Sequence, residues 1–188
     1  MIITLIVAVL AAGAGVLRGG SLTALADTRF RWVALLLTGL AVQVIYDIWR
    51  PEGLSDRGAL MIVLASFAAV AGFLLINWRL PGMVLAGTGL ALNVVAIAAN
   101  GAMPVWDRAV DAAGLSTPSS EEFGVKHEPL TDDTVLPWIT DVIPIPILET
   151  VISVGDVLLA AGIGWLVFAR TVSRSGDREV ARRRAPRR

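Results

Sequence analysis

Residues 147–168, ILETVISVGDVLLAAGIGWLVF, form an apolar stretch long enough to cross a bilayer, yet they include Glu149 and Asp156. A carboxylate in hydrocarbon is costly, so an acidic residue in such a segment normally faces a bundle interior or a water-filled cavity. Any fold of this chain must shield Asp156 from lipid. Asp156 is therefore the first candidate for a functional residue.

The composition indicates a membrane protein along the whole chain. Of its 188 residues, 55% are hydrophobic and 17% are charged, with a mean hydropathy of +0.71. Soluble domains have about 25% charged residues, and a soluble fold of this size could not bury so much apolar surface. The sequence has no cysteine, which excludes disulfides, thiolate metal sites and a cysteine nucleophile within it.

Apolar runs predict five transmembrane helices, because every backbone polar group in hydrocarbon must be paired internally. The runs cover residues 2–17, 32–49, 59–78, 83–99 and 147–168. We therefore predict an all-α fold, a polytopic membrane helical bundle that forms one transmembrane domain over residues 1–169. It carries a long extracytoplasmic loop, 100–146, and a basic, disordered cytoplasmic tail, 170–188.

The basic residues predict the orientation. With the C-terminus in the cytoplasm, twelve of the sixteen Lys and Arg residues lie inside and four outside, which favours N-out, C-in. The expected location is the plasma membrane. Eight of the twelve belong to the tail, which we expect to bind anionic lipid headgroups rather than nucleic acid.

The predicted outer loop is acidic and holds Lys126 and His127. We expect short interfacial helices near 107–113 and 132–139 and no independent domain. His127 is the only histidine and a candidate base, ligand or pH sensor, although a loop histidine is more often simply solvated. The acidic residues lack the spacing of a calcium loop, and we expect neither a metal nor a cofactor.

Polar residues on the predicted spans share helix faces. On the last span Glu149, Ser153 and Asp156 follow an i, i+4, i+7 spacing, which puts them on one face. The predicted polar cluster comprises Gln43, Asn93, Asn100, Glu149, Ser153 and Asp156. With Asp47 they could line an outward-opening cavity, closed by Lys126, His127 and Asp141. The alternative is interhelical hydrogen bonding without further function.

Four blocks of sequence carry a resemblance to a known family: residues 99–105 (ANGAMPV), Lys126-His127, residues 141–146 (DVIPIP) and residues 153–156 (SVGD). In these blocks the chain resembles a family of small, uncharacterised bacterial integral membrane proteins, classified only as a domain of unknown function. The resemblance implies a membrane location and supplies no activity. Independently of it, we expect a membrane-protein partner or a homo-oligomer.

A second, local likeness lies in residues 139–143 (ITDVI) followed by residues 153–156. This pattern is similar to the catalytic end of the lipoprotein signal peptidases, which are intramembrane aspartyl enzymes. The resemblance implies Asp141 and Asp156 as the catalytic pair. Gly155 departs from the alanine usual there. Tyr46-Asp47 with residues 154–156 looks like the motifs of presenilin-type proteases, which makes Asp47 an alternative partner.

Three functions stay open at this point. The first is a non-catalytic accessory, assembly or scaffold protein that acts through its helix bundle and outer loop. The second is an aspartyl hydrolase centred on Asp156 with Asp141 or Asp47, which requires two carboxyl groups in a cavity open to water. The third is a proton- or cation-coupled carrier in which Asp156 titrates.

Overall fold

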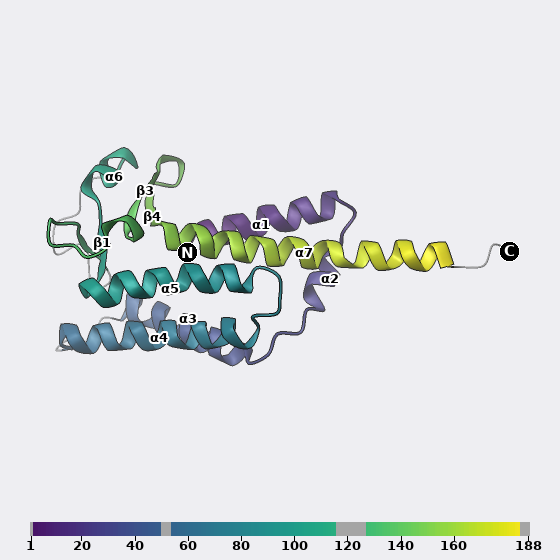
Figure 1. The fold of residues 1–188 in the computed structure, drawn as a ribbon, viewed down its shortest axis with the longest axis horizontal. Helices are drawn as coiled ribbons and strands as arrows, with labels where there is room; N and C mark the ends of the chain where they lie inside the picture. Colours follow the sequence, from purple (N-terminus) through teal and green to yellow (C-terminus); the bar gives the residue numbers. More distant parts are fainter. Residues whose placement is uncertain (1, 50–53, 116–126, 185–188) are drawn as a thin grey trace.

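The computed structural model describes residues 2–49, 54–115 and 127–184; of Asp47, Asp56 and residues 173–184 it describes only the backbone. Within these residues, long helices run along the long axis of the molecule (Figure 1). They are α1 (Ile2–Leu17), α3 (Val33–Ile48), α4 (Asp56–Ile76), α5 (Met83–Asn100) and α7 (Val154–Arg184). The short helix α2 (Leu22–Ala26) follows α1, and Ser21 Oγ caps it by accepting a hydrogen bond from the Thr23 N–H.

Three of these helices are long and apolar enough to cross a membrane. The qualifying stretches are Arg57–Ile76, Met83–Asn100 and Val154–Val172. The apolar helices Ile2–Leu17 and Val33–Tyr46 are shorter. The first four apolar runs of the sequence thus coincide with helices, and by length two of those four suit a full crossing.

The fifth predicted span differs from the structure at both ends. Its first residues form a 3-10 turn, η2 (Pro146–Leu148), and a strand, β4 (Thr150–Ser153), so the helix begins only at Val154. Glu149 lies between the turn and the strand with a φ of 46°. At its other end α7 continues to Arg184, so the backbone is helical through most of the tail for which the sequence predicts disorder.

The prediction of an all-α chain is wrong at one end of the bundle, where a small mixed sheet lies. Its strands are β1 (Met103–Val105), β2 (His127–Pro129), β3 (Asp141–Ile145) and β4, in the order β2-β1-β3-β4. β1 is parallel to β2 and β3, and β3 is antiparallel to β4. β3 and β4 are rich in β-branched residues, and with the shorter β1 and β2 they satisfy their backbone groups with one another here, outside the long helices.

Two short helices accompany the sheet. α6 (Asp107–Ala112) lies where the sequence predicts the first interfacial helix. Of the second, predicted near 132–139, only η1 (Pro137–Ile139) is helical. Asn100, at the end of α5, holds this connection in place, because its side chain accepts from the Val135 N–H and donates to the Val135 carbonyl.

Helices α5 and α7 pack closely because glycines face one another across their contact. A Cβ on Gly89 of α5 would overlap the backbone of Gly155 and Leu159 on α7. A Cβ on Gly162 of α7 would overlap the backbone of Ala86 on α5. Small residues that let backbones approach are typical of helix contacts within membranes.

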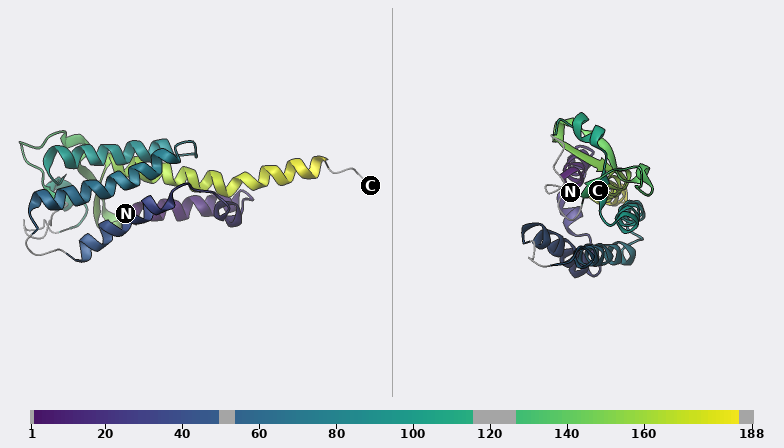
Figure 2. Two further views of the ribbon diagram at one scale, coloured as in Figure 1. Left: turned by 90° about the horizontal axis from the view of Figure 1, so that it is seen from below. Right: turned by 90° about the vertical axis from the view of Figure 1, so that its left-hand side faces the viewer.

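On its other side α5 packs against α4, and α4 carries α3 (Figure 2). Larger side chains fill these contacts, including Phe73, Leu74 and Leu90. Asn77, just after α4, fixes the start of α3 by hydrogen bonding to both backbone groups of Arg31. The contact of α5 with α7 is therefore packed by glycines, and the contact of α5 with α4 by larger side chains.

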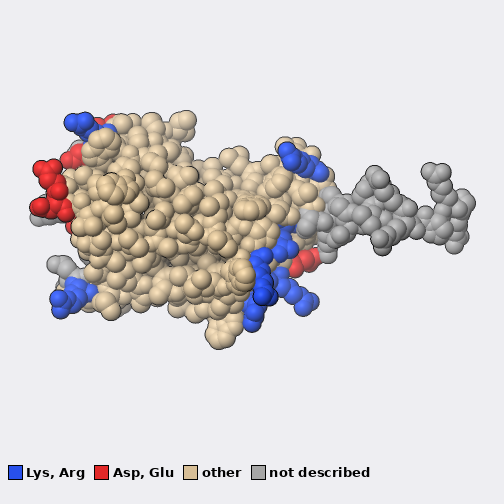
Figure 3. Space-filling view, viewed as in Figure 1, with Lys and Arg blue, Asp and Glu red and all other residues tan. Residues whose placement is uncertain are grey.

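Charged residues gather at the ends of the molecule (Figure 3). On the face shown, acidic residues cluster at the end that holds the sheet, and basic residues are most numerous at the other end of the bundle. The wide band between them shows no charged residue on this face. This distribution matches an apolar belt between two water-facing ends.

Candidate functional site: an acidic pocket beneath the sheet

The first turn of α7 is closed by a reciprocal cap between Ser153 and Asp156. Ser153 Oγ accepts from the Asp156 N–H at 2.9 Å, and the Ser153 N–H donates to Asp156 Oδ2 at 3.3 Å. This is the capping-box arrangement, with an acid at the third helical position. It fixes the carboxyl group of Asp156 at the start of the helix.

Asn93 of α5 completes this cluster from the neighbouring helix. Its Nδ2 donates to Asp156 Oδ1 at 2.8 Å, and its Oδ1 accepts from Ser153 Oγ at 2.8 Å. Asn93 is 7% exposed and Ser153 is fully buried. Asn93 and Ser153 thus each donate one hydrogen bond and accept another within the cluster, and both carboxylate oxygens of Asp156 accept, as buried polar groups require.

Gly155 makes room for Asn93. A Cβ at Gly155 would overlap Asn93 Oδ1 and approach the Gly89 carbonyl. An alanine at this position is therefore incompatible with the observed position of Asn93. The departure from the signal-peptidase pattern at Gly155 has this physical cause.

The sheet brings Asp141 to the same place. Asp141 is the first residue of β3, where it pairs with Val105 of β1 on one side and with Ser153 of β4 on the other. His127 of β2 approaches from the far side of β1, with its Nε2 3.7 Å from Asp141 Oδ2. Residues distant in sequence thus meet through strand register.

Asp141 is an acid held in an unfavourable environment. It is 6% exposed, and its Oδ1 is buried with no hydrogen-bond partner among the described residues. Burial, followed by the negative charge of Asp156, raises the pKa of Asp141 to about 8. At neutral pH its folded form mostly carries a proton. A buried acid with an oxygen that lacks a hydrogen-bond partner is typical of functional sites.

These groups line one cavity of about 170 Å³. Its polar wall is made by Asn93, His127, Asp141 and Asp156, and its apolar wall by Val63, Phe67, Ile97 and Met103. The volume is enough for several water molecules, each occupying about 30 Å³. We call this cavity the acidic pocket.

The acidic pocket contains some of the predicted site residues and not others. Asn93, Ser153, Asp156, Asp141 and His127 come together in or beside it. Glu149 is exposed and lies before β4, so the predicted continuous face of Glu149, Ser153 and Asp156 is wrong.

The other predicted residues lie elsewhere. Asn100 anchors the connection at Val135, and Gln43 lies on α3, outside the pocket lining. The side chain of Asp47 and the whole of Lys126 lie outside the described residues.

Sequence reasoning missed the apolar wall of the pocket. Phe67 and Val63 lie one helical turn apart on α4, and Met103 begins β1. Their spacing predicts ordinary helix packing and a loop, so no signal in the sequence marks them. Among the described residues, no group of three or more His, Asp or Glu side chains is placed to hold a metal ion.

The fold and the pocket define a mostly helical protein with helices suited to a membrane and an acid-lined cavity at one end. Residues 27–168 match the family of unknown function DUF5317, and the chain belongs to this family. The match confirms the resemblance to a family without assigned activity. The matched range contains every residue of the pocket lining.

A relative in Thermotoga maritima, described as an uncharacterized protein, is 30% identical over 107 residues. The matched region is 55% of this chain and 60% of the relative. No solved structure matches the chain.

Proposed function

We propose that the chain is a multi-pass protein that crosses a cell membrane five times, with its N-terminus outside and its C-terminus inside. Three helices of sufficient length and the uncharged band between the two ends support this. The shorter α1 packs along α7, so we place α1 at the same depth, within the uncharged band. The sheet and the acidic pocket would then face outward, at the level of the lipid headgroups.

The pocket, we propose further, is the active site of an aspartyl hydrolase. The observation that carries this proposal is the cavity that Asp141 and Asp156 line together. Asp141 Oδ1 is buried beside it and has no hydrogen-bond partner among the described residues. A pocket that served only to join helices would not require a buried acid with an oxygen that lacks a hydrogen-bond partner. Two carboxyl groups in different environments can divide the roles of acid and base.

The reaction would hydrolyse an amide or ester carbonyl. Water adds to the carbonyl carbon while Asp156 takes the water proton and Asp141 gives its proton to the carbonyl oxygen. On collapse, the bond to the leaving group breaks, Asp156 protonates that group, and the diol proton returns to Asp141. Both carboxyl groups regain their first states, so the cycle needs no other reactant.

The raised pKa of Asp141 gives the reaction a pH signature. The protonated form is required, so the rate should fall as pH rises through about 8, where Asp141 loses its proton.

Mass spectrometry in ¹⁸O-labelled water tests the hydrolase. Membranes from a strain lacking the protein are incubated with the purified wild type, Asp141→Asn or Asp156→Asn, and labelled new carboxylates are counted. We expect labelling from the wild type and none above background from either variant. Asp133→Asn, an exposed acid at the same end, is the matched control and should label normally. Equal labelling by all four proteins, or by none, would reject the hydrolase.

A second candidate is the non-catalytic accessory or assembly protein. The observation in its favour is that both oxygens of Asp156 already accept hydrogen bonds within the chain. In that role Asp156→Asn should keep both fold and function. The asparagine carbonyl can accept from the Ser153 N–H, and its NH2 can donate to the Asn93 carbonyl oxygen once the Asn93 amide turns over. No comparable observation supports the carrier. Measured from the sheet end, the last pocket-lining residue on α5 is Asn93 and that on α7 is Asp156.

A further inference from the structure

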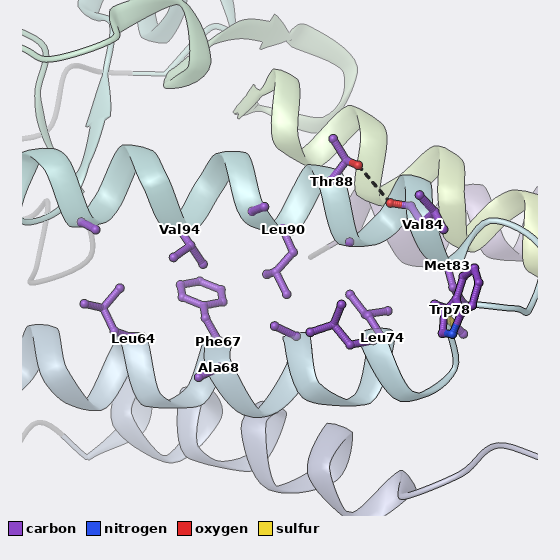
Figure 4. A pocket seen from close by; sticks show the side chains of 15 residues that line it. Leu64, Phe67, Ala68, Leu74, Trp78, Met83, Val84, Thr88, Leu90 and Val94 are labelled. Carbon is purple, nitrogen blue, oxygen red and sulfur yellow. Dashed lines mark hydrogen bonds between the residues drawn. The ribbon is translucent and has the colours of Figure 1, made fainter.

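A second cavity, of about 610 Å³, runs as a groove between α4 and α5 (Figure 4). Its ends are marked by Leu64 and Ala98 near the sheet and by Trp78 and Val84 near the α4–α5 turn. Phe67 lines both this groove and the acidic pocket, so its ring stands between the two.

The groove is lined almost wholly by apolar groups. Its one hydroxyl, that of Thr88, already donates to the Val84 carbonyl and therefore needs no hydrogen-bond acceptor on a ligand in the groove (Figure 4). The lining faces outward between two helices that are long and apolar enough to span a membrane. In a bilayer such a surface is in contact with lipid chains.

The dimensions suit one acyl chain. The lining extends along α5 from Met83 to Ala98, which is about 22 Å at 1.5 Å per residue. This length exceeds the hydrocarbon depth of one leaflet, about 15 Å or half of the usual core, so a chain from one leaflet can lie within it. Leu74 of α4 and Leu90 of α5 both line the groove and belong to one buried hydrophobic cluster, so the two helices remain packed together along it.

A cation stands at the end of the groove near the turn. The guanidinium of Arg79 lies over the ring of Trp78, 5.3 Å from its centroid, and Trp78 itself lines the groove. Arg79 is exposed at the end of the bundle where basic residues are most numerous. An anionic headgroup above an acyl chain in the groove would meet this charge.

We propose that the groove binds one anionic glycerophospholipid of the inner leaflet, with an acyl chain along α4 and α5 and its phosphate at Arg79. The site is distinct from the acidic pocket and from the basic tail. It rests on the proposed membrane orientation and is independent of the proposed hydrolysis.

Native mass spectrometry of the full chain, released from detergent, tests this site with two probes of equal chain length, phosphatidylglycerol and phosphatidylcholine. We expect the wild type to retain one phosphatidylglycerol in preference to phosphatidylcholine. Arg79→Gln should reduce that preference about fivefold, the usual effect of one basic residue near a membrane surface. Arg57→Gln, an exposed arginine at the opposite end of α4, is the control and should keep the preference.

A second set of variants in the same experiment fills the groove. Ala91→Trp and Gly87→Leu place bulk in the groove and should each lower retention of both lipids at least tenfold. Ala65→Trp, on an exposed face of α4 outside the groove, should retain them. Undiminished binding in both groove variants would overturn the proposal, as would equal retention of the two lipids by the wild type.

The absence of cysteine allows a direct test of the rival occupant, a second copy of the chain. A Cβ at Gly87 meets no atom within 4 Å, so Gly87→Cys fits without strain. Disulfide-linked dimers of this variant in membranes would place another copy in the groove and overturn the lipid site. Labelling of the lone thiol by a maleimide carried on an acyl chain, without dimers, is the expected result. These readouts do not depend on hydrolysis, so the lipid site and the active site can fail separately.

Discussion

The two sides of α5 differ in how they meet their neighbours. Toward α7 the backbones are so close that glycines are required, and polar side chains are held in one arrangement. Toward α4 large side chains keep the helices apart and leave an apolar groove. The close contact positions Asn93 and Asp156, whereas the open contact leaves room for a chain of a lipid. The chemistry is therefore expected to depend on small residues at the first contact.

The largest difference in stability is expected between two single substitutions that lie two residues apart on α5. Gly89→Ala should destabilise the fold by about 3 kcal/mol, because the new methyl group would overlap the backbone of α7. Gly87→Ala, on the groove side, meets open space and should be neutral or slightly stabilising. Thermal unfolding in one detergent measures both. Equal melting temperatures would contradict the close packing of α5 on α7.

Removing the interhelical hydrogen bonds should have the next largest effect. Asn93→Ala leaves the buried Ser153 hydroxyl and an oxygen of Asp156 without their partner, at a cost of about 2 kcal/mol. Asn93→Asp keeps the size but replaces the donor with a second carboxyl group, so it should destabilise at neutral pH and recover at low pH. The melting temperature as a function of pH tests this, and a flat response for Asn93→Asp would show that Asn93 does not donate to Asp156.

A smaller effect is expected on the α4 side. Asn77→Ala removes the hydrogen bonds to the Arg31 backbone that hold the start of α3. The freed groups are only partly buried and can take water, so a loss of about 1 kcal/mol is expected. The acidic pocket should keep its properties. A change in the pKa of Asp141 in this variant would show that the two halves are coupled.

The long helices could be predicted from the sequence because apolar runs and turn residues mark them locally. The run 83–99 and α5 (Met83–Asn100) differ by one residue, since Gly82 and Gly101 bound both. Helix length and the need to pair backbone polar groups in lipid are enough to predict such segments.

The sheet could not be predicted for a different reason. The run 147–168 is apolar apart from a few polar residues, so periodicity does not separate the strand β4 from the helix that follows it. Strands of three to five residues depend on partners distant in sequence, as in the pairing of Asp141 with Val105 and Ser153. Asp141 was a candidate from resemblance, yet its burial beside His127 follows only from strand register.

The pKa of Asp141 tests the central claim most directly, because the shared pocket of the two acids should be visible in its titration. Infrared difference spectroscopy of the carboxyl stretch, with Asp141→Asn to assign the band, follows this group in the full-length protein. The account predicts titration near pH 8 in the wild type and at a lower pH in Asp156→Asn, where the neighbouring charge is gone. Titration of Asp141 near its ordinary pKa of about 3.9, unchanged in Asp156→Asn, would contradict the account.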